Sequence, residues 1–162
     1  MVTIFYLNYK KRKGMIQMSK IYDKYISLKT NNNTTNTLYL FKYGIFFIFV
    51  DNDAKIASNL LHLKLSNLND SVVKCGFPVN SLSKYISLLN NTQYNIQIVN
   101  MSSDKPISTT DYIFFESLKD IFNEIISLNI DSLSISQAYD FLYNMQSKLI
   151  DINKEYNIEK AK

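Results

Sequence analysis

Residues 37–50 constrain the fold of this chain more than any other segment, because two short apolar runs flank a single glycine there. Leu38–Lys42 and Phe46–Val50 have the length and the aromatic and branched content of buried strands. Gly44 between them can adopt the backbone conformation that a tight turn between two strands requires. The segment therefore predicts a β-hairpin.

Helix-like and strand-like patterns alternate on both sides of this hairpin as far as Val99. Apolar residues spaced three and four apart are typical of amphipathic helices, whereas strict alternation is typical of half-buried strands. The order of these elements predicts an α/β domain over residues 15–100. We expect a first helix over residues 18–29. A second helix has Asp51 or Asp53 as N-cap and the apolar face Ala54, Ala57, Leu60 and Leu61, and a third has Asn80 or Ser81 as N-cap and the apolar face Leu82, Tyr85, Leu88 and Leu89. The further strands cover residues 61–65, 72–78 and 94–99.

The last third of the chain predicts two helices after a polar linker over residues 101–113. Ser134 and Gln137 form the sequence pattern of a capping box at the start of the second helix. We therefore expect a C-terminal helical hairpin over residues 114–153 and a polar tail over 154–162. Apolar residues recur along the second helix at steps of three and four, as in a helical hairpin or a dimer seam: Ile135, Ala138, Leu142, Met145, Leu149 and Ile152.

The formal charge of the chain, +4, comes entirely from its beginning. Residues 1–14 contain the basic run Lys10–Lys13 and no acid, whereas fourteen lysines and fourteen acidic residues balance from Met15 onward. The basic segment is either an arm for phosphate or lipid contact or an untranslated stretch before a start at Met15 or Met18. In both cases we expect it to be dispensable for the fold. Proteins that bind nucleic acids normally have a basic face. The rest of this chain can have such a face only if its lysines and its acidic residues lie on different parts of the surface.

The composition offers no catalytic or cofactor-binding centre. Phosphate-binding loops need closely spaced glycines, and the three glycines of this chain lie far apart, so we expect no nucleotide cofactor. His62 and Cys75 are the single histidine and the single cysteine, too few ligands for a zinc site. We expect His62 on the surface and Cys75 buried, with no metal, no cofactor and no enzymatic activity.

The same composition bears on location. One cysteine excludes an intramolecular disulfide and is typical of a reducing compartment. The longest uninterrupted apolar run, Ile45–Val50, has six residues, whereas a membrane-spanning helix needs about 20. We therefore expect a cytoplasmic protein without a membrane segment.

The residues around the predicted hairpin resemble a known family. Leu38–Ala54 is similar to the opening of the mismatch-recognition domain of the MutS DNA mismatch repair family, where an apolar strand precedes Gly-Asp-Phe-Tyr-Glu-x-Phe and then Asp-Ala. Cys75–Pro78 stands where that family has Met/Cys-Gly-Ile/Val-Pro. Ser83–Leu89 and Tyr94–Val99 resemble the helix and the strand that follow. The resemblance implies a mixed β-sheet flanked by helices.

A second resemblance covers the tail. Asn129–Tyr143 is similar to the helical segment that closes the MutS ATPase region, with Ile135 where the family favours proline. Together the two resemblances imply a MutS head joined to a MutS tail, without the connector, lever, clamp and ATPase regions. The tail segment of the family lies at a subunit interface. This implies a homo-oligomer formed through Ile135, Ala138, Leu142, Met145 and Leu149.

The resemblance also implies a DNA-binding site. Phe46 occupies the position of the family phenylalanine that inserts beside a mismatched base, with Gly44 before it and Lys42 as a nearby phosphate contact. Ile48 stands where the family has a glutamate, and its side chain forms no hydrogen bond with a base. We therefore expect a non-enzymatic module that binds mismatched or distorted double-stranded DNA, degenerate in base reading. The alternative is a protein-interaction or dimerisation module derived from MutS that no longer binds DNA.

Overall fold

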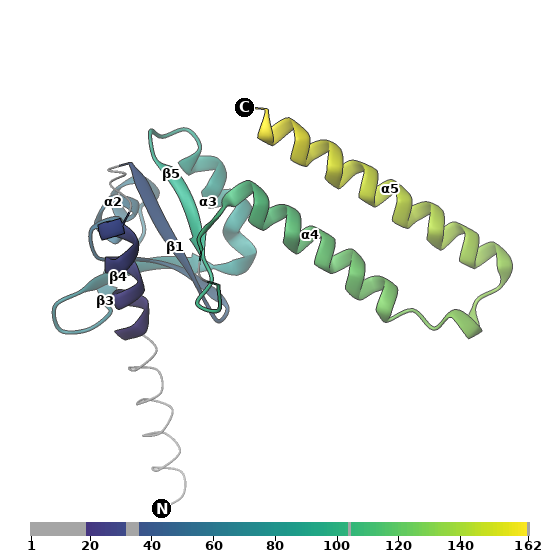
Figure 1. Cartoon of the computed structure of the whole chain (residues 1–162), viewed down its shortest axis with the longest axis horizontal. Helices are drawn as coiled ribbons and strands as arrows, with labels where there is room; N and C mark the ends of the chain where they lie inside the picture. Colours follow the sequence, from purple (N-terminus) through teal and green to yellow (C-terminus); the bar gives the residue numbers. More distant parts are fainter. Residues whose placement is uncertain (1–18, 32–35, 104, 162) are drawn as a thin grey trace, which may run out of the picture. The chain divides into compact units, whose positions relative to one another are not determined.

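The computed structural model describes residues 19–31, 36–103 and 105–161 (Figure 1). The chain divides into two compact units, which cover residues 1–106 and residues 107–162. The basic segment over residues 1–14 lies outside the described residues, so the expectation that it is dispensable stays a prediction.

The first unit is built on a mixed β-sheet, which confirms the predicted α/β architecture with flanking helices. Within this unit the strands lie in the order β3-β4-β2-β1-β5. β1 is antiparallel to β2 and parallel to β5, and β4 is antiparallel to both β2 and β3. The elements are a helix over residues 19–31, β1 Thr37–Tyr43, β2 Phe46–Val50, α2 Asp51–Leu61, β3 Ser66–Asn67, β4 Val73–Pro78, a 3-10 turn Val79–Ser81, α3 Leu82–Leu89 and β5 Asn95–Val99.

The predicted β-hairpin is confirmed. Gly44 has a φ of +57°, a left-handed conformation that glycine adopts without steric cost, and it reverses the chain between β1 and β2. In the ladder Tyr43 pairs with Phe46 and Lys42 pairs with Phe47. Because successive side chains of a strand point to opposite faces, Phe46 and Phe47 lie on different sides of the sheet.

One face of the sheet is covered by the helix over residues 19–31, called the N-terminal helix below. Its residues Ile21, Tyr25 and Leu28 are buried, at the three-and-four spacing that predicts this helix. They form one core cluster with Phe41 and other residues of the same sheet face. This packing places the N-terminal helix on the side of the sheet to which Phe46 points.

The opposite face carries α2 and α3. The Cys75 thiol on β4 donates to the carbonyl oxygen of Ala54 on α2, 3.3 Å away. The Tyr85 ring on α3 stacks on Phe77 of β4, with the ring centroids 4.3 Å apart. Cys75 is buried as predicted, and burial raises the pKa of its thiol to about 12. The thiol therefore stays protonated and serves as a small core residue.

The predicted side-chain caps of α2 and α3 are wrong. Val50 occupies the N-cap position of α2, and neither Asp51 nor Asp53 caps it. The Asp53 carboxylate instead turns inward, where it accepts a hydrogen bond from the N–H of Tyr39. Ser81 occupies the N-cap position of α3, but its side chain forms no capping hydrogen bond. The hydrogen-bond donors in the core therefore orient the Asp53 side chain, and the free N–H groups at the start of α2 do not.

The predicted strand over residues 61–65 is also wrong. α2 continues to Leu61 and ends at His62, which has a φ of 53°. The N–H groups of His62 and Leu63 both donate to the carbonyl oxygen of Ser58. Leu61 and Leu63 therefore lie at the C-terminal end of a helix and do not pair with a strand. His62 is exposed, as predicted.

The second unit contains the predicted helical hairpin. Ser108 caps α4 by accepting a hydrogen bond from the N–H of Asp111, so this helix begins inside the segment 101–113 predicted as a linker. The capping box formed by Ser134 and Gln137 is confirmed. No helix in the described part of the chain is long and apolar enough to cross a bilayer. The elements are β6 Ile107–Ser108, α4 Thr109–Ile126, a 3-10 turn Ile130–Ser132 and α5 Ile135–Lys160.

Polar contacts near both ends hold α4 and α5 antiparallel. Asp111 accepts a hydrogen bond from the Tyr156 hydroxyl at 2.8 Å, and its carboxylate lies 2.9 Å from the Lys160 ammonium. Near the other end of α4, Glu124 lies 2.7 Å from Lys148. The contacts of Tyr156 and Lys160 explain why α5 continues through most of the segment predicted as a polar tail.

Candidate nucleic-acid interface

The tip of the β1–β2 hairpin presents two apolar side chains to solvent. Ile45 in the turn is 75% exposed, and Phe46 at the start of β2 is 43% exposed. Phe47 and Phe49 of the same strand are completely buried. Of the three phenylalanines of β2, Phe46 is therefore the one whose ring a ligand can reach.

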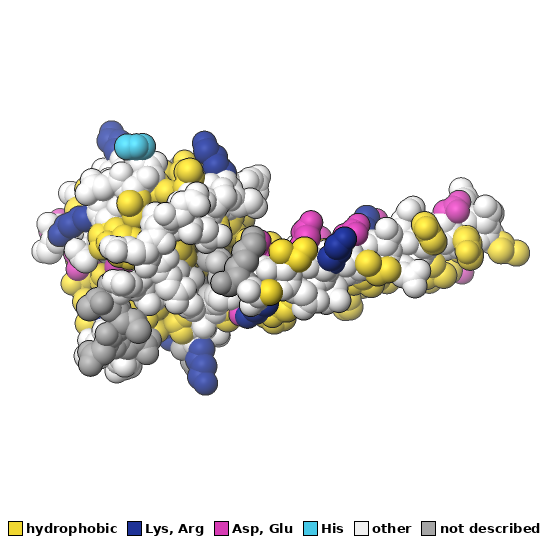
Figure 2. Space-filling view, turned by 90° about the horizontal axis from the view of Figure 1, so that it is seen from above, with side chains coloured by type: hydrophobic (Ala, Val, Ile, Leu, Met, Phe, Trp, Pro, Cys, Tyr) yellow, Lys and Arg dark blue, Asp and Glu magenta, His cyan; other side chains and the backbone are white. Residues whose placement is uncertain are grey.

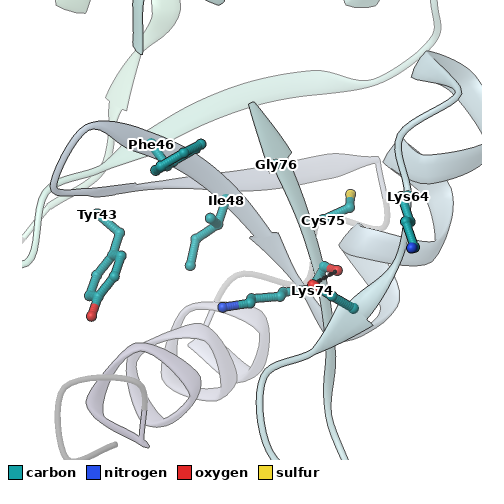
Figure 3. A pocket seen from close by; sticks show the side chains of 8 residues that line it. Tyr43, Phe46, Ile48, Lys64, Lys74, Cys75 and Gly76 are labelled. Carbon is teal, nitrogen blue, oxygen red and sulfur yellow. Dashed lines mark hydrogen bonds between the residues drawn. The ribbon is translucent and has the colours of Figure 1, made fainter. Parts of the chain in front are cut away.

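A groove with a volume of about 300 Å³ lies beside Phe46 (Figure 3). Its floor belongs to β2 and β4, where Ile48 pairs with Gly76 in the ladder. Figure 3 shows Tyr43 and Phe46 on one side of this floor and Lys64 on the other. The lining residues are Tyr43, Phe46, Ile48, Lys64, Ser66, Lys74, Cys75 and Gly76.

Gly76 keeps the floor of the groove open. A Cβ atom at this position would collide with the carbonyl oxygen of Phe47 and would come within 2.9 Å of Cγ2 of Ile48. A larger residue would therefore push β2 and β4 apart or displace Ile48, because a close-packed interior cannot absorb the added volume. Close approach of two strands, and not a turn, accounts for this glycine.

The lining residues of the groove are all neutral or basic. Lys64 follows α2, Ser66 belongs to β3 and Lys74 belongs to β4, so three separate parts of the chain contribute polar groups to it. Partial burial lowers the pKa of the Lys74 ammonium. Two lysines at one partly desolvated groove attract an anion more strongly than the same charges would in open solvent.

Comparison with known proteins decides the family. The MutS domain I family model matches residues 19–126. The chain belongs to the MutS domain I family. The match extends beyond residue 100, the predicted end of the domain, and includes all of α4. The resemblance of Asn129–Tyr143 to the end of the MutS ATPase region lies beyond it and stays a prediction.

Curated relatives agree with this assignment. The DNA mismatch repair proteins MutS from two strains of Leptospira interrogans, of serovars copenhageni and Lai, are each 37% identical to the chain over 67 residues. The aligned segment is 41% of this chain but only 8% of the length of those relatives. The match therefore spans only a small part of the length of these relatives.

Ile48, at the position where the family has a glutamate, is part of the core of this MutS domain I. Ile48 is 6% exposed and belongs to the cluster formed with the N-terminal helix. Its side chain supplies an apolar floor and no hydrogen-bonding atom. The groove therefore lacks a side-chain acceptor at that position.

Lys42 does not lie beside Phe46. Because it pairs with Phe47 across the ladder, its side chain points to the sheet face away from the groove. Lys64 and Lys74 line the groove instead, and sequence reasoning missed both. Their proximity to Phe46 depends on how β2, β3 and β4 associate, which no local pattern reveals. The available signal was the alternation along β4, which puts Lys74 and Gly76 on one face.

The charges that balance over residues 15–162 separate between the two units. Residues 15–106 contain nine lysines and five acidic residues, a net charge of +4. Residues 107–162 contain five lysines and nine acidic residues, a net charge of −4. The unit that carries Phe46 is therefore basic by itself, and a net positive charge favours contact with a polyanion.

Exposed apolar side chains line the helical hairpin, and Figure 2 shows hydrophobic side chains along it. Ile135 is 92% exposed and Leu142 is 66% exposed, and Leu149 repeats the same seven-residue spacing on α5. Met145 is buried, on the side of α5 that also carries Lys148, the partner of Glu124. Met145 therefore belongs to the core of the hairpin and cannot serve the dimer interface to which it was predicted to contribute.

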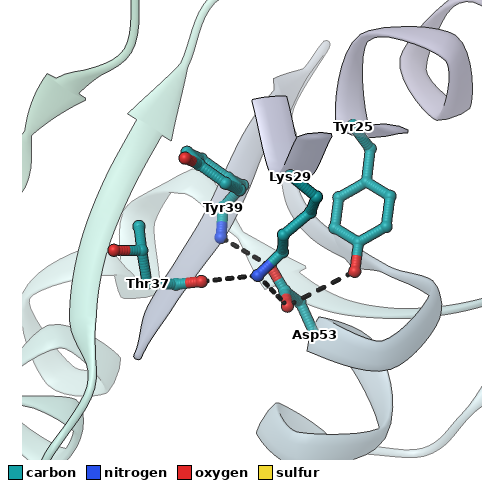
Figure 4. Close-up of polar contacts among 5 residues, drawn as sticks. All are labelled: Tyr25, Lys29, Thr37, Tyr39 and Asp53. Carbon is teal, nitrogen blue, oxygen red and sulfur yellow. Dashed lines mark hydrogen bonds and ion pairs between the residues drawn. The ribbon is translucent and has the colours of Figure 1, made fainter. Parts of the chain in front are cut away.

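A buried polar cluster joins the N-terminal helix to β1 and α2 (Figure 4). Oδ1 of Asp53 lies 2.7 Å from Nζ of Lys29, and Oδ2 accepts a hydrogen bond of 2.8 Å from the N–H of Tyr39. Burial raises the pKa of Asp53, although the hydrogen bond from Lys29 partly opposes this effect. Asp53 is completely buried, so the cluster connects these three elements within the core.

Proposed function

We propose that this chain is a non-enzymatic DNA-binding module of the MutS domain I type, which inserts Phe46 into distorted duplex DNA. The observation that carries the proposal is the exposed Phe46 ring at a hairpin tip, beside a groove lined by Lys64 and Lys74. An apolar side chain of this kind can enter between two base steps from the minor groove and kink the duplex.

The energetics of insertion favour duplexes that are already weakened. Unstacking a base step costs a few kcal/mol, and a mismatch or an unpaired nucleotide reduces that cost. Because Ile48 offers no hydrogen bond to a base, the preference should follow the deformability of the site and not the identity of the mismatched bases. The proposed module has therefore lost the hydrogen bond to the base but keeps the inserting phenylalanine.

Electrostatics supports the same partner. The net charge of +4 over residues 15–106 attracts the phosphate backbone, and such attraction weakens steeply as salt rises.

The proposal includes a cytoplasmic location. The single cysteine is buried and is consistent with a reducing compartment.

A mobility-shift assay on matched, G·T-mismatched and single-bulge duplexes tests the proposal. We expect binding at low salt, tighter for the two distorted duplexes, and a loss of that preference in Phe46→Ala. Phe115→Ala, which removes an exposed phenylalanine from α4, is the matched control and should behave as wild type. Absence of binding to every duplex at low salt would overturn the proposal.

The alternative function, self-association through the helical hairpin, is favoured by the exposed apolar residues of α5. Ile135, Leu142 and Leu149 repeat every seven residues and stay exposed within the second unit. With Ala138, which is half-buried, they form the proposed homodimer seam, and Met145 is excluded from it.

Sedimentation at tens of micromolar tests this seam. We expect a dimer for the wild type and a monomer for Leu142→Asp, because a carboxylate cannot be buried in an apolar seam without a partner. Asn144→Asp adds the same charge at another exposed position of α5 and should stay dimeric. A monomeric wild type would rule the seam out and leave the DNA-binding proposal unaffected.

A further inference from the structure

The helical hairpin of the second unit has two faces, and an ion pair marks one of them. Ile121 on α4 and Met145 on α5 are both buried, so they mark the line along which the two helices pack. Glu124 follows Ile121 by three residues, Lys148 follows Met145 by three, and the two charged groups lie 2.7 Å apart. A step of three residues falls about 60° short of a full helical turn. Because α4 and α5 are antiparallel, the same rotation on each helix leads to the same face of the hairpin.

The face with this ion pair is acidic. It contains a groove with a volume of about 330 Å³, in which four carboxylates surround one ammonium group. The lining residues are Ser117, Asp120, Ile121, Glu124, Lys148, Asp151, Ile152 and Glu155. The excess of acids agrees with the net charge of −4 over residues 107–162. Two copies of this face repel each other, because their net charges have the same sign.

The opposite face is apolar between Phe122 and Leu149. Phe122, one residue after Ile121, and Leu142, three residues before Met145, are rotated away from the buried line in the opposite sense to the ion pair. Figure 2 shows hydrophobic side chains mostly along one edge of the hairpin and charged side chains mostly along the other. The seven exposed side chains that we call the apolar face are Phe122, Ile125, Ile126, Ile135, Tyr139, Leu142 and Leu149.

The area of the apolar face matches that of a stable protein interface. Its seven side chains are between 41% and 92% exposed. At about 100–150 Å² each they present roughly 800 Å² of surface, and an interface of standard size buries about 800 Å² per partner. A contiguous apolar patch of this size is uncommon on a monomer and marks an interaction site.

A second copy of the chain is the partner that suits this face best. None of the seven side chains is charged, so two apolar faces meet without repulsion and without burying an unpaired charge. A twofold axis can place the face against itself, as in most symmetric dimers. An anionic membrane surface is disfavoured, because the net charge of the second unit is −4.

We propose that the apolar faces of two copies pack together in a four-helix bundle, with the acidic grooves on the outside. The proposal rests on the self-association named above as the alternative function and extends it from α5 to α4. Phe122, Ile125 and Ile126 of α4 then belong to the same interface as the heptad residues of α5. Each dimer carries two Phe46 rings, one on each first unit.

Sedimentation equilibrium of the whole chain at micromolar concentrations tests the part assigned to α4. We expect a wild-type dimer and a rise of about tenfold or more in the dissociation constant of Phe122→Asp and Ile126→Asp, because a carboxylate in this interface has no partner. Asn123→Asp adds the same charge at an exposed position of α4 outside the apolar face and should keep the wild-type value. Circular dichroism checks that the helices are folded, and Phe122→Gln replaces either aspartate variant that unfolds.

The results separate the bundle from the narrower seam on α5. A dimer that dissociates with Leu142→Asp but not with folded Phe122→Asp or Phe122→Gln overturns the bundle, while the seam on α5 stands. A monomeric wild type overturns both and leaves the DNA-binding proposal unaffected, because sedimentation is measured without DNA.

Salt and lipid distinguish the remaining modes of association. Added salt should leave the dimer as tight as before or make it tighter, because it screens the repulsion between the acidic units. A dimer that weakens with salt would indicate head-to-tail contact between a basic first unit and an acidic second unit, and would overturn the bundle. A monomeric chain that floats with phosphatidylcholine vesicles would show that the apolar face binds lipid, and would also overturn it.

Discussion

The ammonium of Lys29 on the N-terminal helix lies 2.7 Å from the carboxylate of Asp53 on α2, and Asp53 is completely buried. Lys29 also donates to the carbonyl oxygen of Thr37 at 2.6 Å. These contacts connect the N-terminal helix to the start of β1 and to the first turn of α2. Loss of the cation would leave a carboxylate without charge compensation in the core.

Lys29→Met should lower the free energy of unfolding by about 3–5 kcal/mol at pH 7, the range for breaking a buried ion pair. Burial raises the pKa of Asp53 in the folded state above its unfolded value, and removal of Lys29 raises it further. Protonation therefore favours the folded variant, so its deficit should shrink as the pH falls through that raised pKa. Urea unfolding at pH 7 and pH 5 measures the change.

Two controls sharpen this prediction. Lys20→Met removes an exposed cation from the same helix and should change stability little. Adding Asp53→Asn to Lys29→Met should recover part of the loss at pH 7. A deficit that stays constant with pH would contradict the role assigned to the carboxylate.

Phe46 and Phe47 should respond in opposite ways to truncation, because they are adjacent in sequence but lie on different sheet faces. Phe47→Ala creates a cavity in the core and should cost about 3–5 kcal/mol of folding free energy. Phe46→Ala should cost far less stability, because its ring is partly exposed, but should weaken binding to a bulged duplex by about 1–3 kcal/mol. Calorimetry of both variants, with duplex titrations, decides whether the two roles are separate.

Restoring a glutamate at position 48 should harm the fold. Ile48→Val removes one methyl group and should cost about 0.5–1.5 kcal/mol. Ile48→Glu should cost more at pH 7, because it loses the packing with the N-terminal helix and places a carboxylate in a position that is 6% exposed. Denaturant unfolding compares the two, and a Glu variant as stable as the Val variant would show that the groove solvates this position.

The hairpin of the second unit should lose stability in acid through Asp111. Hydrogen bonds from Ser108, Lys160 and Tyr156 lower the pKa of Asp111 from 3.8 to about 2. A lowered folded-state pKa means that its contribution is present above the unfolded value and is lost as the pH falls toward 2. Asp111→Asn should therefore destabilise the hairpin at pH 6 and have little effect near pH 2.

Melting of α4 and α5 followed by circular dichroism at the two pH values tests this prediction. Asp140→Asn, at an exposed position of α5, is the control and should leave the melting curve unchanged at both. An equal effect of Asp111→Asn at pH 6 and pH 2 would mean that the Asp111 charge does not hold the hairpin.

Local signals in the sequence were sufficient for much of the fold. A glycine between two apolar runs determined the β1–β2 hairpin, and Ser134 with Gln137 determined where α5 begins. The three-and-four spacing of Ile21, Tyr25 and Leu28 determined the buried side of the N-terminal helix. Each of these signals depends on residues within a few positions of one another, so the local sequence is sufficient to predict these three features.

Only the tertiary structure decided which side chains meet. Lys64 and Lys74 reach the groove of Phe46 through the association of β2, β3 and β4, while Lys42, which is closer in sequence, faces the other way. Asp53 satisfies the helix-capping pattern, yet donors from the N-terminal helix and β1 hold it in the core. Burial and strand register arise from residues far apart in the chain, so periodicity within one segment cannot determine them.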